Sequence, residues 1–249
     1  MLASSEKTYF HGAITMKRTL CAAMLAATLS AAPAANAVDF DVTITNLTNS
    51  IYFTPFLAAA HPAGNNLFVT GQAASANLQA MAEGGDTSGL IADVTTLGAT
   101  IADNPAGGLL GPASSTTFNM NTDGTSNDRL SIVAMLLPTN DAFAGLNAIE
   151  IPVAPGTYTF DVPAYDAGTE ANDELLTGGG MPGVAGIPGD PSMLTGTGGT
   201  GAAGTDANPT VHIHRGSLGD TDAMGGNSDL DSRVHRWLNP VVRVTITVN

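Results

Sequence analysis

Two stretches of the chain place acidic side chains just after apolar, strand-like runs. Asp141 follows the continuously apolar run 132–137, and Asp166 and Glu170 follow the alternating run that ends at Val162. A calcium ion is held by about six to eight oxygens, usually from carboxylates and backbone carbonyls on flexible loops. Loops at one end of a β-sandwich lie together, so these carboxylates could share a cation. The alternative is that they only bind local backbone N–H groups.

Two further acidic residues are candidates for additional oxygen ligands. Asp173 lies shortly after Glu170, and Asp123 precedes the apolar run 132–137 on a third loop. Between Asp166 and Glu170, Gly168 suits a tight backbone turn because glycine adopts positive φ at low steric cost.

Two histidines alternate with apolar residues near the end of the chain. His212 and His214 are separated by Ile213, so on a strand both imidazoles would project from the same face. Such a pair can chelate zinc or copper, whereas a solvated strand face is the simpler interpretation. The sequence leaves open whether they bind a transition metal.

Nucleophilic catalysis has little support in the sequence. No Gly-x-Ser-x-Gly motif occurs, and the single cysteine, Cys21, lies in the N-terminal apolar segment. A carboxylate pair such as Asp166 and Glu170 is chemically able to hydrolyse glycosides. Sugar sites usually contain several aromatic side chains for stacking, however, and the chain has 1 Trp. We therefore expect no catalytic residues.

The elements that must position these side chains are mostly strands. Strict alternation of apolar and polar residues predicts strands at 38–45, 157–162 and 241–248, and the apolar run 132–137 predicts a central strand covered on both faces. Further strands are expected at 51–56, 148–153 and 211–214. Short helices are expected after Ser75 and from about Thr87 to Leu97. This pattern predicts an all-β fold, an antiparallel β-sandwich with one or two short helices in its loops.

The N-terminal segment is typical of secretion. Residues 16–37 combine a Lys-Arg pair, an apolar run and a small-x-small cleavage pattern, which together predict a signal peptide. Residues 1–15 fit no part of such a signal, and we interpret them as an extension upstream of the true start at Met16. The mature domain is then 38–249, with residues 178–204 predicted to be an exposed, flexible Gly-rich insertion.

Charge narrows the class of partner. Residues 38–249 contain 21 acidic and 5 basic side chains, a formal charge of −16, with no lysine. Nucleic acid is excluded as an expected partner because phosphate binding needs clustered Lys and Arg. No membrane insertion is expected once the signal is removed. The acidity suits a soluble extracellular protein or one that binds cations, and a saline habitat would explain it equally well.

Three segments together resemble the spondin domain of the F-spondin and mindin family and of many secreted bacterial proteins. They are Leu137–Leu146, Tyr165–Glu174 and Trp237–Ile246. The resemblance implies a sandwich similar to calcium-dependent membrane-targeting modules. It also implies calcium bound by Asp141, Asp166 and Glu170. Glu170 stands where animal members have aspartate, the aromatic after the first aspartate is displaced to Phe143, and the cysteines of animal members are absent.

These observations predict a secreted, calcium-binding, non-catalytic module that binds an extracellular or cell-surface ligand or mediates adhesion. Two alternatives remain at this level. One is a secreted metal-dependent hydrolase acting on extracellular polymers, and the other is a self-associating matrix component.

Overall fold

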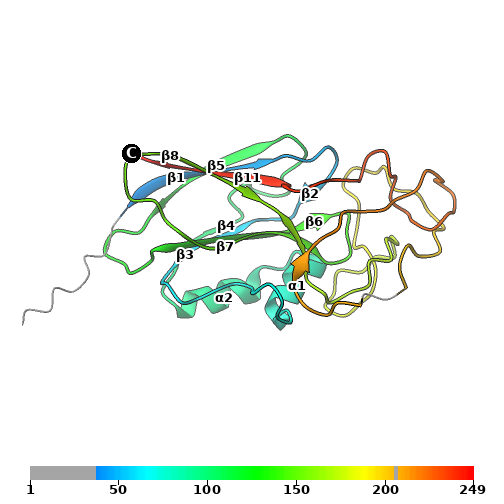
Figure 1. Cartoon of the computed structure of the whole chain (residues 1–249), viewed down its shortest axis with the longest axis horizontal. Helices are drawn as coiled ribbons and strands as arrows, with labels where there is room; N and C mark the ends of the chain where they lie inside the picture. The colour runs from blue at the N-terminus through cyan, green and yellow to red at the C-terminus, as the bar shows by residue number, and fades with distance from the viewer. Residues whose placement is uncertain (1–37, 205–206) are drawn as a thin grey trace, which may run out of the picture. The chain divides into compact units, whose positions relative to one another are not determined.

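The computed structural model describes residues 38–204 and 207–249, so the predicted signal peptide and upstream extension lie outside the described residues. Two antiparallel sheets lie face to face, and two short helices cover the outer side of one of them (Figure 1). The predicted antiparallel β-sandwich is confirmed.

The first sheet has four strands, and every neighbouring pair in it is antiparallel. In spatial order the strands are β5 (Ser115–Asn121), β1 (Asp39–Asn46), β11 (Val242–Val248) and β8 (Gly156–Val162). Along β1, Phe40, Val42 and Ile44 are buried and the residues between them face outward. Because side chains alternate across a strand, one face of this sheet lies on the core.

The second sheet carries the acidic loops. Its strands in spatial order are β10 (His212–Ile213), β9 (Ala164–Asp166), β7 (Ala142–Glu150), β6 (Arg129–Leu137), β3 (Leu57–His61) and β4 (Thr100–Asp103), and β2 (Tyr52–Phe53) pairs with β6 off this path. β6 is buried along almost its whole length, as the apolar run 132–137 predicted. The chain leaves β6 just before Asp141, and β9 ends at Asp166, so both acidic loops lie at one end of the sheet.

The two helices are α1 (Ala76–Gly84) and α2 (Ser88–Thr96), close to their predicted positions. The Ser75 hydroxyl accepts the N–H of Leu78 at 3.1 Å, which caps the start of α1. Gly85 ends α1 with a φ of 73°, a conformation that glycine adopts without strain.

The core has two layers, one on each side of the second sheet. Between the sheets, Phe40, Phe53 and Ile44 belong to a large buried cluster. Between the second sheet and the helices, Met81 and Phe143 belong to a smaller one. The second layer explains why the inner strands of this sheet show no polar face.

Two strand predictions were wrong in their extent. The segment 51–56 contains only the two-residue β2, and the buried, alanine-rich β3 follows it. β7 begins at Ala142, within the segment predicted as a loop before 148–153. β3 and the start of β7 were missed because small residues buried on both faces give neither alternation nor a strong strand propensity.

The Gly-rich segment 178–204 has no regular secondary structure, but it is not a free surface loop. Ile187 is completely buried, and its backbone exchanges hydrogen bonds with Leu175 at 2.8 Å and Gly178 at 3.2 Å. Gly180 lies so close to the end of α1 that a side chain on Gly84 would collide with its carbonyl oxygen. The expectation of an exposed insertion therefore fails at Ile187, whereas Met181 and Met193 are exposed, and the flexibility of the segment stays a prediction.

Candidate metal centre

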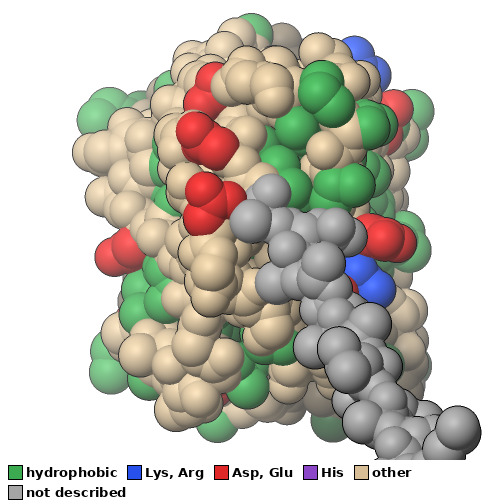
Figure 2. All heavy atoms as spheres, turned by 90° about the vertical axis from the view of Figure 1, so that its left-hand side faces the viewer, with side chains coloured by type: hydrophobic (Ala, Val, Ile, Leu, Met, Phe, Trp, Pro, Cys, Tyr) green, Lys and Arg blue, Asp and Glu red, His purple; other side chains and the backbone are tan. Residues whose placement is uncertain are grey.

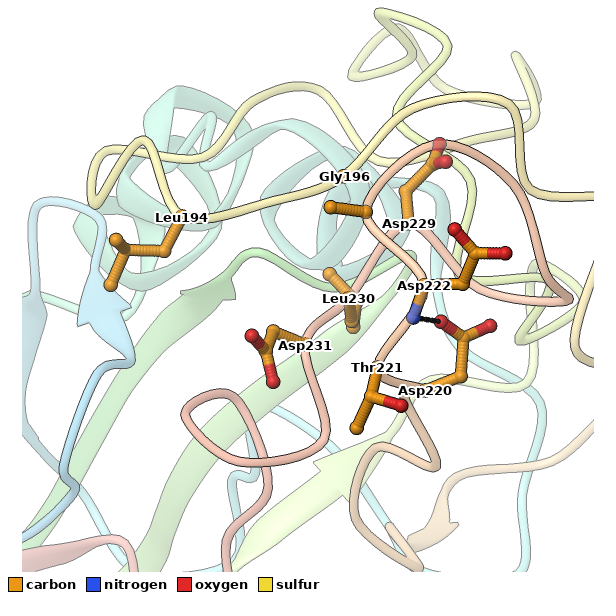
Figure 3. Close-up of a pocket in the computed structure, with 9 residues that line it drawn as sticks. Leu194, Gly196, Asp220, Thr221, Asp222, Asp229, Leu230 and Asp231 are labelled. Atoms are coloured by element: carbon orange, nitrogen blue, oxygen red, sulfur yellow. Dashed lines mark hydrogen bonds between the residues drawn. The ribbon is translucent and has the colours of Figure 1, made fainter.

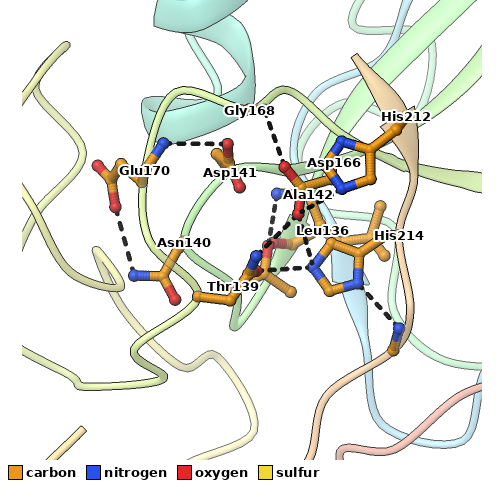
Figure 4. Close-up of polar contacts among 12 residues, drawn as sticks. Leu136, Thr139, Asn140, Asp141, Ala142, Asp166, Gly168, Glu170, His212 and His214 are labelled. Atoms are coloured by element: carbon orange, nitrogen blue, oxygen red, sulfur yellow. Dashed lines mark hydrogen bonds and ion pairs between the residues drawn. The ribbon is translucent and has the colours of Figure 1, made fainter. Parts of the chain in front are cut away.

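Asp141 and Asp166 lie together at the loop end of the second sheet (Figure 4). The register of β7 and β9 pairs Ala142 with Asp166, which makes Asp141 the next residue along the same edge. Both residues are buried, with exposed fractions of 0% and 1%. The structure therefore brings together two of the three carboxylates that the sequence singled out.

One oxygen of Asp141 has no partner. Its Oδ2 accepts the N–H of Thr169 at 2.8 Å and the N–H of Glu170 at 3.2 Å. Its Oδ1 is buried and makes no hydrogen bond. Burial, and then the charge of Asp166, raises the pKa of Asp141 from its ordinary value of 3.8 to about 7. A cation beside Oδ1 would stabilise the ionised carboxylate and lower this pKa.

Asp166 is held by polar side chains and by the turn that follows it. Its Oδ1 accepts the N–H of Gly168 at 2.8 Å, and its Oδ2 accepts the Asn172 amide at 2.8 Å. Gly168 has a φ of 70° and lies close to the backbone of residues 208–210, so glycine is required there for two reasons. The role predicted for this glycine agrees with its backbone conformation.

Glu170 is also buried but is directed elsewhere. Its Oε2 accepts the N–H of Gly186 at 3.1 Å and the Asn140 amide at 3.3 Å, while Oε1 is buried without a partner. Burial is the main reason that its pKa rises to about 7, and the charges of Glu83 and Asp141 add to it. Figure 4 shows the carboxylate turned toward Asn140 rather than toward Asp141.

As these side chains lie, they do not form a complete metal site. Within residues 38–204 and 207–249, no group of three or more His, Cys, Asp and Glu side chains is arranged so that it could hold a metal ion. The orientation of Glu170 is one physical reason. The orphaned oxygens of Asp141 and Glu170 nevertheless fit a cation, because a buried carboxylate oxygen without a partner is costly.

The two additional candidates differ in position. Asp173 lies near the site, where its Oδ1 accepts the Asn140 amide at 2.8 Å. Asp123 is exposed in the turn before β6. That turn and Asp141 lie at opposite ends of β6, a nine-residue strand about 26 Å long. The structure does not bring Asp123 to the site.

The two histidines contact Asp166, and the position of its proton prevents His214 from binding a metal. Nδ1 of His214 accepts the N–H of Gly216 at 2.9 Å, so the proton lies on Nε2, which donates to Asn172 at 2.9 Å. In this arrangement His214 offers no lone pair to a metal. Nδ1 of His212 donates to the Thr210 carbonyl at 2.7 Å, and its Nε2 faces Asp166 Oδ2 at 3.7 Å.

The carboxylates of this site lie within a region that matches a known protein family. The Spondin_N family model matches residues 43–174, more than half of the chain. The chain belongs to the Spondin_N family. The match includes Asp141, Asp166 and Glu170 and ends before the Gly-rich segment. No curated protein matches the chain.

Spondin domains are typically extracellular, and the family therefore indicates an extracellular module. In the part of the chain that the structure describes, no helix has the length and apolar character needed to cross a membrane. Figure 2 shows the end of the molecule opposite the Gly-rich segment, where other acidic side chains of this spondin domain lie at the surface. Surface carboxylates of that kind are solvated, whereas Asp141 and Asp166 are enclosed.

Sequence reasoning missed the amides of this spondin site. Asn140 links Glu170 and Asp173, and Asn172 links Asp166 and His214. Neither residue carries a charge, although both lie within the segments 137–146 and 165–174. The only available signal was their position, directly beside acidic residues on the two loops.

A buried Ser–His pair lies elsewhere in the second sheet. His61 Nε2 lies 2.8 Å from Ser131 Oγ, and Ser131 Oγ also accepts the N–H of Ala148 at 2.8 Å. Ser131 stands at the irregularity in the β6–β7 pairing between Leu130 and Ile132. The pair therefore ties the two strands together where their register shifts.

A small pocket lies between the Gly-rich segment and the C-terminal loops (Figure 3). Leu194, Gly196 and residues 220–223 and 229–231 line it, and none of these is a predicted ligand. Its carboxylates are engaged: Asp220, for example, accepts three backbone N–H groups, which lower its pKa.

Proposed function

We propose that this spondin domain is a secreted calcium-binding module that mediates extracellular binding or adhesion and is not catalytic. The observation that carries the proposal is the Asp141 carboxylate, which is fully buried beside Asp166 and has one oxygen without a partner.

Electrostatics supports a cation at this position. Among the described residues, no arginine forms an ion pair with Asp141, and residues 38–249 contain no lysine. A buried carboxylate such as Asp141, beside the charge of Asp166, destabilises the folded state. A calcium ion would supply the missing charge, and Asp141, Asp166 and Glu170 would hold it with the oxygens that calcium prefers.

A bound ion would also stiffen the surface. Asp141 lies on the loop after β6, Asp166 ends β9 and Glu170 lies on the loop after β9, so one ion would join the two loops. Loops ordered in advance lose less conformational entropy when a partner binds. This is the link from calcium to recognition of an extracellular ligand.

Calorimetric titration of chelator-treated protein with calcium tests the proposal. We expect heat of binding for the wild type and none for an Asp141→Ala, Asp166→Ala double variant. An Asp39→Ala, Asp41→Ala variant is a matched control, because it removes the same charge from the outer face of β1. If the site variant took up calcium like the control, the site would be wrong. No uptake by the wild type would refute calcium binding.

A further inference from the structure

The His235 side chain is completely buried where the Gly-rich segment meets the C-terminal loops. Its Nδ1 accepts the N–H of Asp231 at 3.0 Å, so this nitrogen carries no proton. The ring is therefore neutral, with its proton on Nε2. That nitrogen faces Ser192 Oγ at 3.3 Å and Asp190 Oδ2 at 3.7 Å.

On the Nε2 side of His235 lies a turn whose backbone N–H groups are bonded to one carboxylate. Asp190 accepts the N–H groups of Ser192, Leu194 and Thr195 and the hydroxyl of Ser192, all within 2.9 Å. Burial would raise the pKa of Asp190, but these hydrogen bonds hold it below its ordinary value. Residues 190–195 thus form a preformed turn that docks on His235.

The two segments joined by His235 also form walls of the pocket in Figure 3. Leu194 and Gly196 line one side, and residues 229–231 line the other. Beyond Thr195, backbone N–H groups also join the two segments: Gly196 donates to the Asp229 carbonyl at 2.6 Å, and Thr197 donates to the Ala223 carbonyl at 3.0 Å. These donors follow residues 190–195, so the contact with His235 is what holds residues 190–195 themselves against the turn 231–235.

We infer that His235 is an acid-sensitive latch: protonation of its ring separates residues 190–195 from the turn 231–235 and opens the pocket. A proton on Nδ1 would turn this nitrogen into a donor facing the Asp231 N–H, which is also a donor, so that hydrogen bond would break. The imidazolium would also have to remain in a buried site.

The charged groups around His235 do not offset the cost of burying its imidazolium form. Asp190, Asp231 and Glu174 each favour the imidazolium, but burial outweighs them and the pKa of His235 lies below its ordinary value of 6.5. The opened state therefore binds the proton more readily than the closed one. The latch is fully stable above pH 6.5 and weakens as the pH falls below that value.

Hydrogen exchange of the metal-free protein at pH 7.5 and pH 5.0, corrected for intrinsic rates, tests the latch. We expect the Asp231 amide, whose acceptor is His235 Nδ1, to exchange up to about thirtyfold faster at pH 5.0, the limit set by an ordinary histidine pKa in the opened state. His235→Asn should abolish this acceleration, because its oxygen can still accept the Asp231 N–H but does not titrate. His212→Asn, at a more exposed ring, should keep it.

Equal exchange at the two pH values in the wild type, or equal acceleration in His235→Asn, would overturn the inference. NMR titration of the His235 ring in the wild type gives an answer that does not depend on the variant folding. A pKa below the ordinary value supports the latch, and a pKa at or above it overturns the latch.

Discussion

Replacing Asp141 with asparagine should change stability in opposite directions without and with calcium. The pKa of Asp141 rises from 3.8 to about 7 through burial and the charge of Asp166. Such a shift corresponds to about 4 kcal/mol of destabilisation of the metal-free protein above pH 7. Asparagine keeps an oxygen for the Thr169 and Glu170 amides and carries no charge. We expect a gain of about 1 to 3 kcal/mol, reduced by an amide donor left without a partner.

Urea unfolding at pH 8, followed by fluorescence of the buried Trp237, measures this effect. In calcium at about 100 times Kd, the wild type should gain about 3 kcal/mol and Asp141→Asn much less, so that their order inverts. The exposed Asp39→Asn is the control, with changes within about 0.5 kcal/mol in both conditions. If Asp141→Asn were destabilised in chelator and kept the full calcium response, the reasoning would be refuted.

Three further changes have expected outcomes. Without metal, calorimetric stability should fall as pH rises from about 4 through 7, because the raised pKa values of Asp141 and Glu170 favour the protonated folded state, and calcium should flatten this profile. Gly84→Ala should cost about 2 kcal/mol in urea unfolding, because its methyl group would meet Gly180, and an unchanged midpoint would contradict that packing. Asn46→Ala should cost about 3 kcal/mol by the same assay, since it strips buried backbone groups of partners; a loss under about 0.5 kcal/mol would contradict this.

The sequence predicted β1, β8 and β11, in which apolar and polar residues alternate strictly, but it missed β5, although that strand also has a polar face. β1 and β11 alternate residue by residue, and their pairing, with Val42 opposite Ile246, joins the two buried faces. β3 and the start of β7 were missed because alanine and glycine fill them and both faces are covered. Periodicity carries no information where no face is exposed to solvent.

The candidate site was predictable in part. The sequence predicted that Asp141 and Asp166 converge because loops at one end of a sandwich lie together, but it did not predict β9, the strand whose pairing with β7 brings Asp166 there. The direction of Glu170 depends on Gly186, which lies in a segment without periodicity, and no local pattern predicts that contact. The latch at His235 was missed for the same reason.

A high-resolution crystal structure of the protein grown with calcium tests the central claim most directly. We expect one ion in contact with the carboxylate oxygens of both Asp141 and Asp166, with Oδ1 of Asp141 among its ligands. A structure in which Asp141 Oδ1 contacts only water or protein, with no ion between the two carboxylates, would contradict it.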